Sequence, residues 1–426
     1  MTHDDRRTSL AVLLVGAVAF VVLAVWLVPW NPVPGGTPGP AAARSVFTAE
    51  QVSKAEEFAT WARVWSWSSL AVSLLVACWF GFTRHGARLV ERMRGPWWWR
   101  VVLAVAALVL IGRVATLPFA VMMHRHLLDF GLTRQGWGGF AADLLRSELV
   151  TILTTSVGLV LLIGCARRWP RAWPAVAGGL LACLVLVGSF VYPLVVEPLF
   201  NDFTPLPDGA LRSQILRLAD REGVHVDDVL VADASRRTTT LNAYVSGFGS
   251  TRRVVLYDNL VHDLPDDQAL SVVAHELAHA RHDDVVIGSV LGASAALLGV
   301  GLLGLAVDAL GRRRHMGDPA LVPLVLALLA VGTLLASPVE NAVSRHIETR
   351  ADVDALRATH DPDAFIRMQR ELSVRALSDP TPPAWSQFWF GSHPTALTRV
   401  AIARTLYETV PSLHREVPKD PVAAQP

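Results

Sequence analysis

The stretch Ser271-Val-Val-Ala-His-Glu-Leu-Ala-His-Ala-Arg-His-Asp-Asp284 contains the motif His-Glu-x-x-His, around which the rest of the chain can be interpreted. On a helix, residues four apart lie on the same face, so the imidazoles of His275 and His279 can hold one ion. Glu276 lies one step round the helix, where it can reach a water on that ion without being a ligand. Two nitrogen ligands, an open position for water and a carboxylate base are the parts of a zinc peptidase site.

The residues before the motif favour a buried helix. Pro265 suits the first helical turn, and the acidic pair Asp266-Asp267 suits the positive end of the helix dipole. Apolar residues then supply one face: Ala269, Leu270, Val272 and Val273. Three fixed residues also occur together by chance, and an ordinary polar helix with solvated histidines is the alternative interpretation. The zinc interpretation therefore needs a further ligand elsewhere in the chain.

The composition is that of a membrane protein. Of the 426 residues, 52% are hydrophobic and only 18% are charged, and the charged residues cluster between long apolar runs. A net charge of +1, without a basic patch interleaved with aromatics, argues against a nucleic-acid partner. Cys78, Cys165 and Cys183 fall in or beside the apolar runs and lack the spacing of a disulfide framework or a thiolate metal site. We therefore expect a multi-pass protein of the cell membrane, with the lipid bilayer as a partner.

Seven apolar segments are long enough to cross a bilayer, for which about 20 residues are needed. They are Leu10–Trp30, Trp65–Phe82, Val101–Met122, Leu149–Ala166, Trp173–Val195, Val285–Leu310 and Pro319–Ala336. The first is too long for a cleaved signal peptide and lacks a clear cleavage site, so we interpret it as a retained anchor. Arg113 lies within the third segment, where a charge must face other helices or water rather than lipid.

The polar stretches between these segments predict the domain organisation. We expect a five-span membrane region (1–196), a soluble α+β segment with a small sheet and the zinc helix (197–284), two further spans (285–338), a helical second half of the catalytic domain (339–410) and a disordered tail (411–426). Short strands are expected at Val229–Ala232, Leu241–Ser246 and Arg252–Tyr257, the last two joined by a hairpin turn at Gly247–Ser250. The predicted fold class is mainly α, with a small α+β domain split by the last two spans.

A catalytic zinc site needs a third protein ligand. His282, Asp283 and Asp284 lie a further turn along the zinc helix, too far along its axis to close on the ion easily. The better candidate is Glu348, which shares a helical face with Asp352 four residues later. Asp352 can then orient a ligating histidine through the other ring nitrogen.

The sequence resembles the type I CAAX prenyl endopeptidases, also called CAAX prenyl protease 1, which are integral-membrane zinc metallopeptidases. Scarce lysine beside abundant arginine, alanine and leucine indicates a bacterial member. The resemblance covers most of the chain and rests on the zinc helix together with Leu117-Pro118-Phe119, Pro198–Pro207, Asn242-Ala-Tyr244, Arg253–Asp258, Ser344-Arg-x-x-Glu348-x-x-Ala-Asp352 and Ser392-His-Pro394 with Arg399.

The resemblance implies seven spans that enclose a large water-filled chamber and one zinc ion per chain. It implies that His275, His279 and Glu348 are the zinc ligands and Glu276 the base. It places His393 near the scissile bond as a donor to the developing oxyanion, and Arg399 on the substrate. Asn242, Ala243 and Tyr244 match an edge strand along which an extended peptide lies; without the resemblance, strand and turn packing would be the favoured interpretation of Asn242 and Tyr244.

The function expected from these residues is hydrolysis of peptide bonds in a peptide or protein substrate. Two alternatives remain open: a membrane quality-control zinc protease of the heat-shock type, and a non-enzymatic transporter or scaffold with a structural zinc. Eukaryotic relatives cleave prenylated proteins that end in a CAAX box. Such substrates are not expected in a bacterium, so the activity can persist with another substrate.

The arginines predict which side of the membrane carries the catalytic domain. Arginine-rich ends and loops fall on one side: Arg6 and Arg7; Arg84, Arg88, Arg92, Arg94 and Arg100; Arg167, Arg168 and Arg171; and Arg312 to Arg314. The positive-inside rule makes that side cytoplasmic. Both halves of the catalytic domain are then extracytoplasmic, whereas the eukaryotic relatives present theirs to the cytosol.

Overall fold

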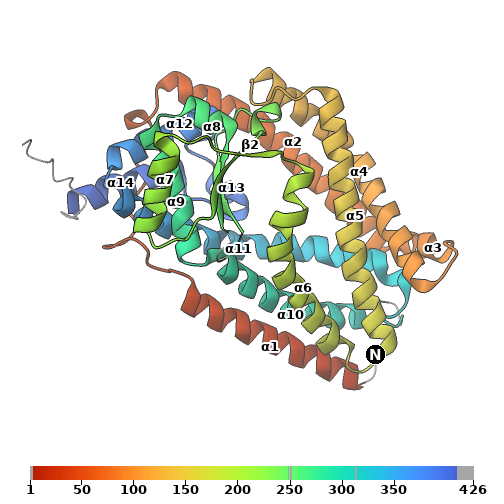
Figure 1. The fold of residues 1–426 in the computed structure, drawn as a ribbon. Coiled ribbons are helices and arrows are strands. Elements are labelled where there is room, and N and C mark those ends of the chain that lie inside the picture. Colours follow the sequence, from red (N-terminus) through yellow and green to blue (C-terminus); the bar gives the residue numbers. More distant parts are fainter. Residues whose placement is uncertain (1–2, 248, 250–251, 312–313, 410–426) are drawn as a thin grey trace, which may run out of the picture.

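A computed structural model describes residues 3–247, 249, 252–311 and 314–409. The hairpin turn expected at 247–250 falls partly outside these residues, and the tail expected at 411–426 falls entirely outside them. Helices dominate the described chain, and a four-stranded sheet lies at one end of the molecule (Figure 1).

Seven helices of the described chain are long and apolar enough to cross a membrane. Each overlaps one of the seven expected segments, so this part of the prediction is confirmed. The helices are α1 (His3–Leu27), α2 (Ala49–Phe82), α4 (Trp97–Asp129), α5 (Trp137–Arg168), α6 (Trp173–Val195), α10 (Asp284–Leu310) and α11 (Val322–Thr359); the short α3 (Arg84–Glu91) joins α2 to α4.

Helices α2 and α11 run well past the apolar segments that they contain. At 1.5 Å per residue, the 38 residues of α11 extend about 57 Å, although about 20 residues suffice to cross a bilayer. Pro338 lies inside α11 without ending it, so the domain boundary expected at residue 338 falls within one continuous helix. Because of this continuity, Glu348 lies on the same helix as the last span.

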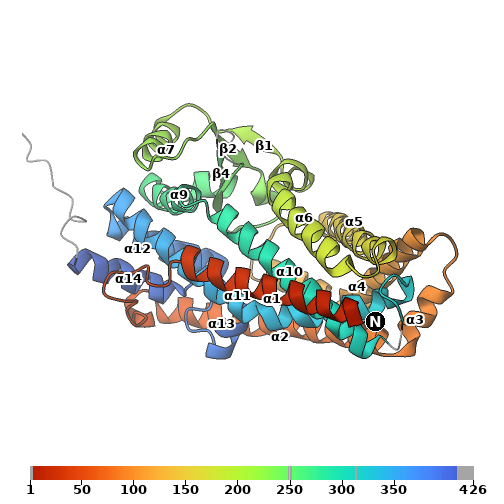
Figure 2. The same ribbon diagram turned by 90° about the horizontal axis from the view of Figure 1, so that it is seen from below.

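Close packing of α1 on α10 depends on glycines. A Cβ placed on Gly301 would lie 2.5 Å from the backbone nitrogen of Leu13, and one on Gly16 would lie 2.3 Å from that of Leu298. Contacts that short do not occur, so larger residues would force the helices apart. Figure 2 shows α1 lying along α10 over its length.

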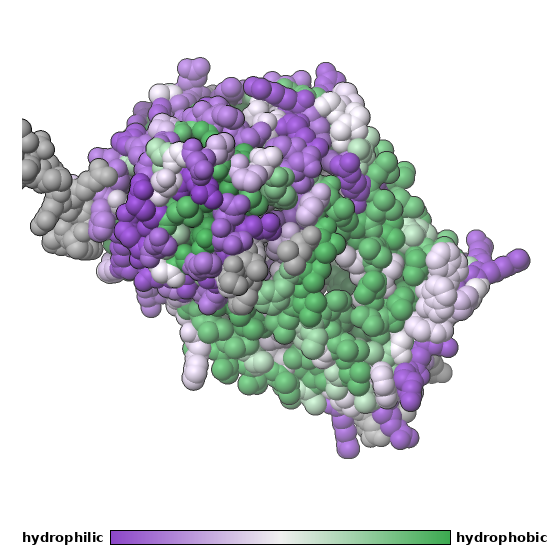
Figure 3. Space-filling view, viewed as in Figure 1, coloured by the Kyte–Doolittle hydropathy of each residue, from purple (hydrophilic) through white to green (hydrophobic). Residues whose placement is uncertain are grey.

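The outer surface of the helical region is apolar, and a hydrophilic surface borders it at both ends (Figure 3). Exposed Leu75, Val114, Leu153 and Leu335 lie on membrane helices, as lipid contact requires. Arg113 of α4 pairs with Glu148 of α5, whose Oε1 lies 2.6 Å from Nε of Arg113. The charge inside this span is therefore matched by a carboxylate on the neighbouring helix.

The sheet has the strand order β1-β2-β4-β3. Its strands are β1 (Phe203–Pro205), β2 (Asp228–Ala232), β3 (Ala243–Ser246) and β4 (Arg253–Tyr257). The central strands β2 and β4 are parallel, and β1 and β3 flank them in antiparallel pairing. Strand β1 was not expected from the sequence, because three residues ending in proline give no alternating pattern. Strand β3 is at one edge of the sheet and carries Ala243 and Tyr244, two of the residues expected to bind substrate; Asn242 directly precedes it.

The helices α7 (Ala210–Arg221), α8 (Asp258–Asp263) and α9 (Asp266–Arg281) complete the first half of the soluble region. After α11, the chain forms α12 (Pro362–Ala376), α13 (Ala384–Phe390) and α14 (Ala396–Thr409). One hydrophobic core joins the two halves: Leu277 of α9 and Leu256 of β4 belong to the same buried cluster as Leu356, Phe365 and Ile402. The two polar regions separated by α10 and α11 in the sequence thus share one core.

Candidate active site

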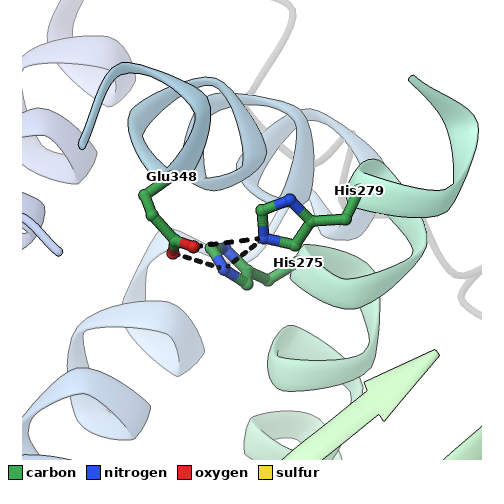
Figure 4. A group of neighbouring side chains, drawn as sticks. All are labelled: His275, His279 and Glu348. Carbon is green, nitrogen blue, oxygen red and sulfur yellow. Dashed lines mark hydrogen bonds and ion pairs between the residues drawn. The ribbon is translucent and has the colours of Figure 1, made fainter. Parts of the chain in front are cut away.

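Helices α9 and α11 bring two histidines and a glutamate together (Figure 4). Nε2 of His275 lies 3.2 Å from Oε2 of Glu348 and 3.2 Å from Nε2 of His279. Nε2 of His279 lies 3.6 Å from Oε1 of Glu348. Among the described residues, these three form the one group of metal-ligating side chains whose donor atoms all lie within 4.8 Å of one another.

The donor set fits zinc. Two imidazole nitrogens and a carboxylate oxygen match the three protein ligands of a catalytic zinc site. Bonds of about 2.0–2.2 Å at tetrahedral angles imply ligand atoms about 3.3–3.6 Å apart, close to the spacing that these side chains show. The described residues supply no fourth ligand to this group, as an open catalytic site requires.

A buried carboxylate fixes the ring of His275. Nδ1 of His275 lies 3.0 Å from Oδ1 of Asp352, whose side chain is fully buried. Because a carboxylate only accepts, Nδ1 donates, and the lone pair of Nε2 points toward the other ligands. Nε of Arg399 donates to Oδ2 of Asp352 at 2.7 Å, and its Nη2 also contacts the same carboxylate. Arg399 therefore lies behind the ligands and does not line the cavity in front of them.

A second carboxylate, not expected from the sequence, fixes the ring of His279. Nδ1 of His279 lies 2.9 Å from Oδ2 of Asp284, and the other oxygen of Asp284 pairs with Arg350. The chain reaches this arrangement through Asp283, whose φ of 52° interrupts the helical path between α9 and α10. The signal in the sequence was a carboxylate five residues after the second histidine.

A cavity of about 460 Å³ lies in front of the three ligands, and both Glu276 and His393 line it. Burial raises the pKa of the Glu276 carboxyl above its ordinary range. Nε2 of His393 lies 3.4 Å from Oε2 of Glu348, and its ring is 59% exposed. The structure thus places the expected base and the expected oxyanion donor at one opening beside the ligands.

Strand β3, with Asn242 directly before it, forms one edge of this cavity through Asn242, Ala243 and Val245. Side chains alternate along a strand, so Tyr244 lies on the opposite face of the sheet. There its hydroxyl donates to Glu197 at 3.5 Å, and Ser246 donates to the same carboxylate at 3.3 Å. Burial raises the pKa of Glu197, which follows the last turn of α6. The side chain of Tyr244 therefore points away from the cavity and is not among the residues that line it.

Two family models match the chain. The model described as peptidase family M48 matches residues 205–406, and the model described as CAAX prenyl protease N-terminal, five membrane helices, matches residues 36–202. The boundary between the two matches coincides with the start of the sheet. Together they cover α2 to α13 and most of α14, which include the soluble region and six of the seven membrane helices of the described chain; α1 lies outside both matches.

Curated relatives agree with these models. An uncharacterized metalloprotease from Bacillus subtilis, YhfN, is 31% identical over 310 residues, which cover 70% of this chain and 71% of that protein. A CAAX prenyl protease 1 homolog from Oryza sativa subsp. japonica is 28% identical over 312 residues, which cover 70% of this chain and 71% of that protein.

The crystal structure of S. mikatae Ste24p shares the fold, with a TM-score of 0.75 and 20% sequence identity, over 93% of this chain and 99% of that one. The predicted fold class, a seven-span helical bundle enclosing a chamber with a small α+β domain, is thereby confirmed. Taken with the family matches and the relatives, this fold shows that the chain belongs to peptidase family M48, as a multi-pass membrane metallopeptidase like the CAAX prenyl proteases.

Proposed function

We propose that the protein is a zinc-dependent endopeptidase that cleaves extended peptide or protein substrates at the cavity between α9, α11 and β3. The observation that carries the proposal is the convergence of His275, His279 and Glu348 on one point at the wall of that cavity. Each chain would hold one zinc ion at these three residues. Bound there, zinc supplies a Lewis acid for the scissile carbonyl and lowers the pKa of the attacking water.

The chain's own residues then move the proton and stabilise charge. Glu276 accepts a proton from the attacking water and delivers it to the leaving amine. His393, on the exposed side of the cavity, donates to the oxygen on which negative charge develops. Asp352 and Asp284 hold the rings of His275 and His279 in the tautomer that ligates. Arg399, which the resemblance places on the substrate, instead supports Asp352 from behind.

The edge of β3 supports a substrate in extended conformation. Tyr257 N–H donates to the carbonyl of Asn242 at 3.0 Å, which makes these two residues a hydrogen-bonded pair. Pairing alternates along antiparallel strands, so the N–H and C=O groups of Ala243 and Val245 point away from β4. Both residues line the cavity. A peptide can therefore add as a further strand there and run past Glu276.

We further propose that the protein lies in the plasma membrane with its catalytic domain outside the cytoplasm. The arginine-rich ends and loops support this orientation, since such short loops are those that the positive-inside rule covers. A chain truncated after Gly317 and fused to alkaline phosphatase or to a fluorescent protein tests it. Fluorescence without phosphatase activity is the expected result, and phosphatase activity would place the catalytic domain in the cytosol.

Chelator-sensitive cleavage of a peptide library by the purified protein in nanodiscs tests the activity. We expect cleavage that stops with a chelator and returns with zinc, at defined positions relative to one terminus. The match to the CAAX prenyl protease N-terminal model favours such defined cleavage over general quality control. Indiscriminate degradation of casein would support the heat-shock type of protease instead, and no cleavage of either would refute the proposal.

A further inference from the structure

Four polar residues of α11 follow one another on a single helical face. Asn341, Arg345, Glu348 and Asp352 are spaced by four, three and four residues, which stacks them one above another. Glu348 and Asp352 belong to the site described above. Arg345 lies one turn and Asn341 two turns before Glu348, and their side chains contact the end of α13 (Figures 1 and 2 show α13 beside α11).

These contacts are all made to backbone carbonyls. Nη1 of Arg345 donates to the carbonyl of Gly391 at 2.5 Å and to that of Gln387 at 3.3 Å. Nδ2 of Asn341 donates to the carbonyl of Trp389 at 2.7 Å. The last carbonyls of a helix have no partner within it and form the negative end of its dipole. Arg345 and Asn341 therefore bind the C-terminal end of the seven-residue α13.

Arg345 is half-buried, and in the part of the chain that the structure describes no carboxylate lies within ion-pair distance of it. Charged side chains that leave water are ordinarily paired. Here the guanidinium is instead directed at two carbonyls of one short segment. The contact therefore holds the C-terminal end of α13 in place against α11.

The segment leads directly to His393. The side-chain amide of Gln387 donates to the carbonyl of His393 at 2.6 Å, and the ring lies 3.4 Å from Glu348 on the same α11 helix. We propose that Arg345, assisted by Asn341, is a positioning residue that sets His393 against the metal ligands. This inference rests on the proposed function, because it assigns Arg345 a role through the oxyanion donor of that reaction.

The other end of α13 is held independently of α11. Nη1 of Arg63 on α2 lies 2.7 Å from Oδ2 of Asp379, ahead of the helix, and Trp67 packs on Trp385 with ring centroids 4.2 Å apart. Loss of Arg345 should therefore release the C-terminal end of α13 and the loop with His393, while the rest stays attached. Arg63 supplies a matched control: an arginine that holds the same segment at the end remote from His393.

Amide hydrogen exchange of the full-length protein in nanodiscs with zinc tests the placement without requiring activity. In R345M we expect faster exchange over residues 387–395, with unchanged zinc content and unchanged exchange in α9. In R63M the residues ahead of α13 should exchange faster and 391–395 should not. Wild-type exchange over 387–395 in R345M would overturn the proposal, even if the protein proves inactive.

A double-mutant cycle tests the link to His393. We expect R345M to lower kcat by about 10- to 100-fold, since misplacement of a reacting group by about 1 Å has that effect, with little change in KM. In an H393A background R345M should have no further effect, and R345K should restore part of kcat. Additive losses in the double variant, or a loss in R63M equal to that in R345M, would overturn the proposal. Absence of chelator-sensitive cleavage in the wild type would instead refute the proposed function, leaving the exchange experiment to decide the placement.

Discussion

The carboxylate of Asp284 lies 2.9 Å from Nδ1 of His279, although Asp284 is the first residue of the sixth membrane helix. The contact joins a ring of the proposed zinc site directly to the membrane bundle. Replacement of Asp284 by asparagine should weaken zinc binding by about 10- to 100-fold, because the amide no longer enforces the ligating tautomer. Competition with a fluorescent zinc chelator measures this change.

Asp283→Asn is the matched control for that measurement. Asp283 is the neighbouring carboxylate, but it pairs with Arg252 rather than with a ligand. Its left-handed backbone also tolerates asparagine. We expect its zinc affinity to stay within about threefold of the wild type, as surface substitutions usually do. Equal losses in the two variants would show that general loss of charge, not the contact with His279, explains the effect.

Glu348 should be required for zinc binding. Its carboxylate is the one oxygen donor within the group of three, so Glu348→Ala leaves only two imidazoles. We expect metal content by mass spectrometry or atomic absorption to fall from about one zinc per chain to a small fraction. Glu340→Ala, which removes an exposed carboxylate two turns earlier on the same helix, should retain zinc. Retained zinc in Glu348→Ala would assign the third ligand to another residue.

Glu276 should be required for cleavage and not for zinc binding. Its carboxylate lines the cavity but lies outside the group of ligands, so Glu276→Gln keeps the shape of the site and removes the base. We expect kcat to fall by about 10²- to 10⁴-fold, the range over which proton transfer contributes, with zinc content unchanged. Normal turnover by this variant would refute the assignment of the base.

The membrane spans were predictable because a bilayer requires about 20 apolar residues, and hydropathy reports that requirement directly. Hydropathy does not report what happens to a helix beyond the apolar core. The residues after 338 were expected to be helical, but hydropathy did not show that they continue the last span through Pro338 as one helix, nor that α2 runs unbroken from Ala49 to Phe82. This continuity places the last span and the proposed ligand Glu348 on one helix.

The three expected ligands and the supporting carboxylate Asp352 followed from residue type and spacing, but the second support, Asp284, did not. If helix α9 continued without interruption, Asp284 would lie too far along its axis to reach the proposed zinc ligands. Only the backbone turn at Asp283 brings the carboxylate of Asp284 to His279. Likewise, the sequence placed Tyr244 on an edge strand without showing which face its ring occupies. That face depends on the pairing of β3 with β4, a long-range contact.

Glu197 should make stability depend on pH. Burial raises its pKa above the value of about 4.5 that it has when exposed, so the folded state favours the protonated form. The associated stability is present below the unfolded pKa and is lost as pH rises through the folded one. Glu197→Gln cannot ionise, so its melting temperature relative to the wild type should increase between pH 4.5 and pH 8. A difference that does not vary with pH over this range would contradict the expectation.

The outward backbone groups of β3 can be tested by removing one of them. Proline at Val245 deletes an N–H that points away from β4, so it should spare the sheet and weaken an added peptide strand. One hydrogen bond contributes about 1 kcal/mol, so KM should rise about fivefold while kcat changes little. Val245→Thr keeps the N–H and the branched shape, and should bind substrate as the wild type does. Peptide substrates N-methylated at the matching position would give independent evidence. An unchanged KM for Val245→Pro with all substrates would show that they do not bind along β3.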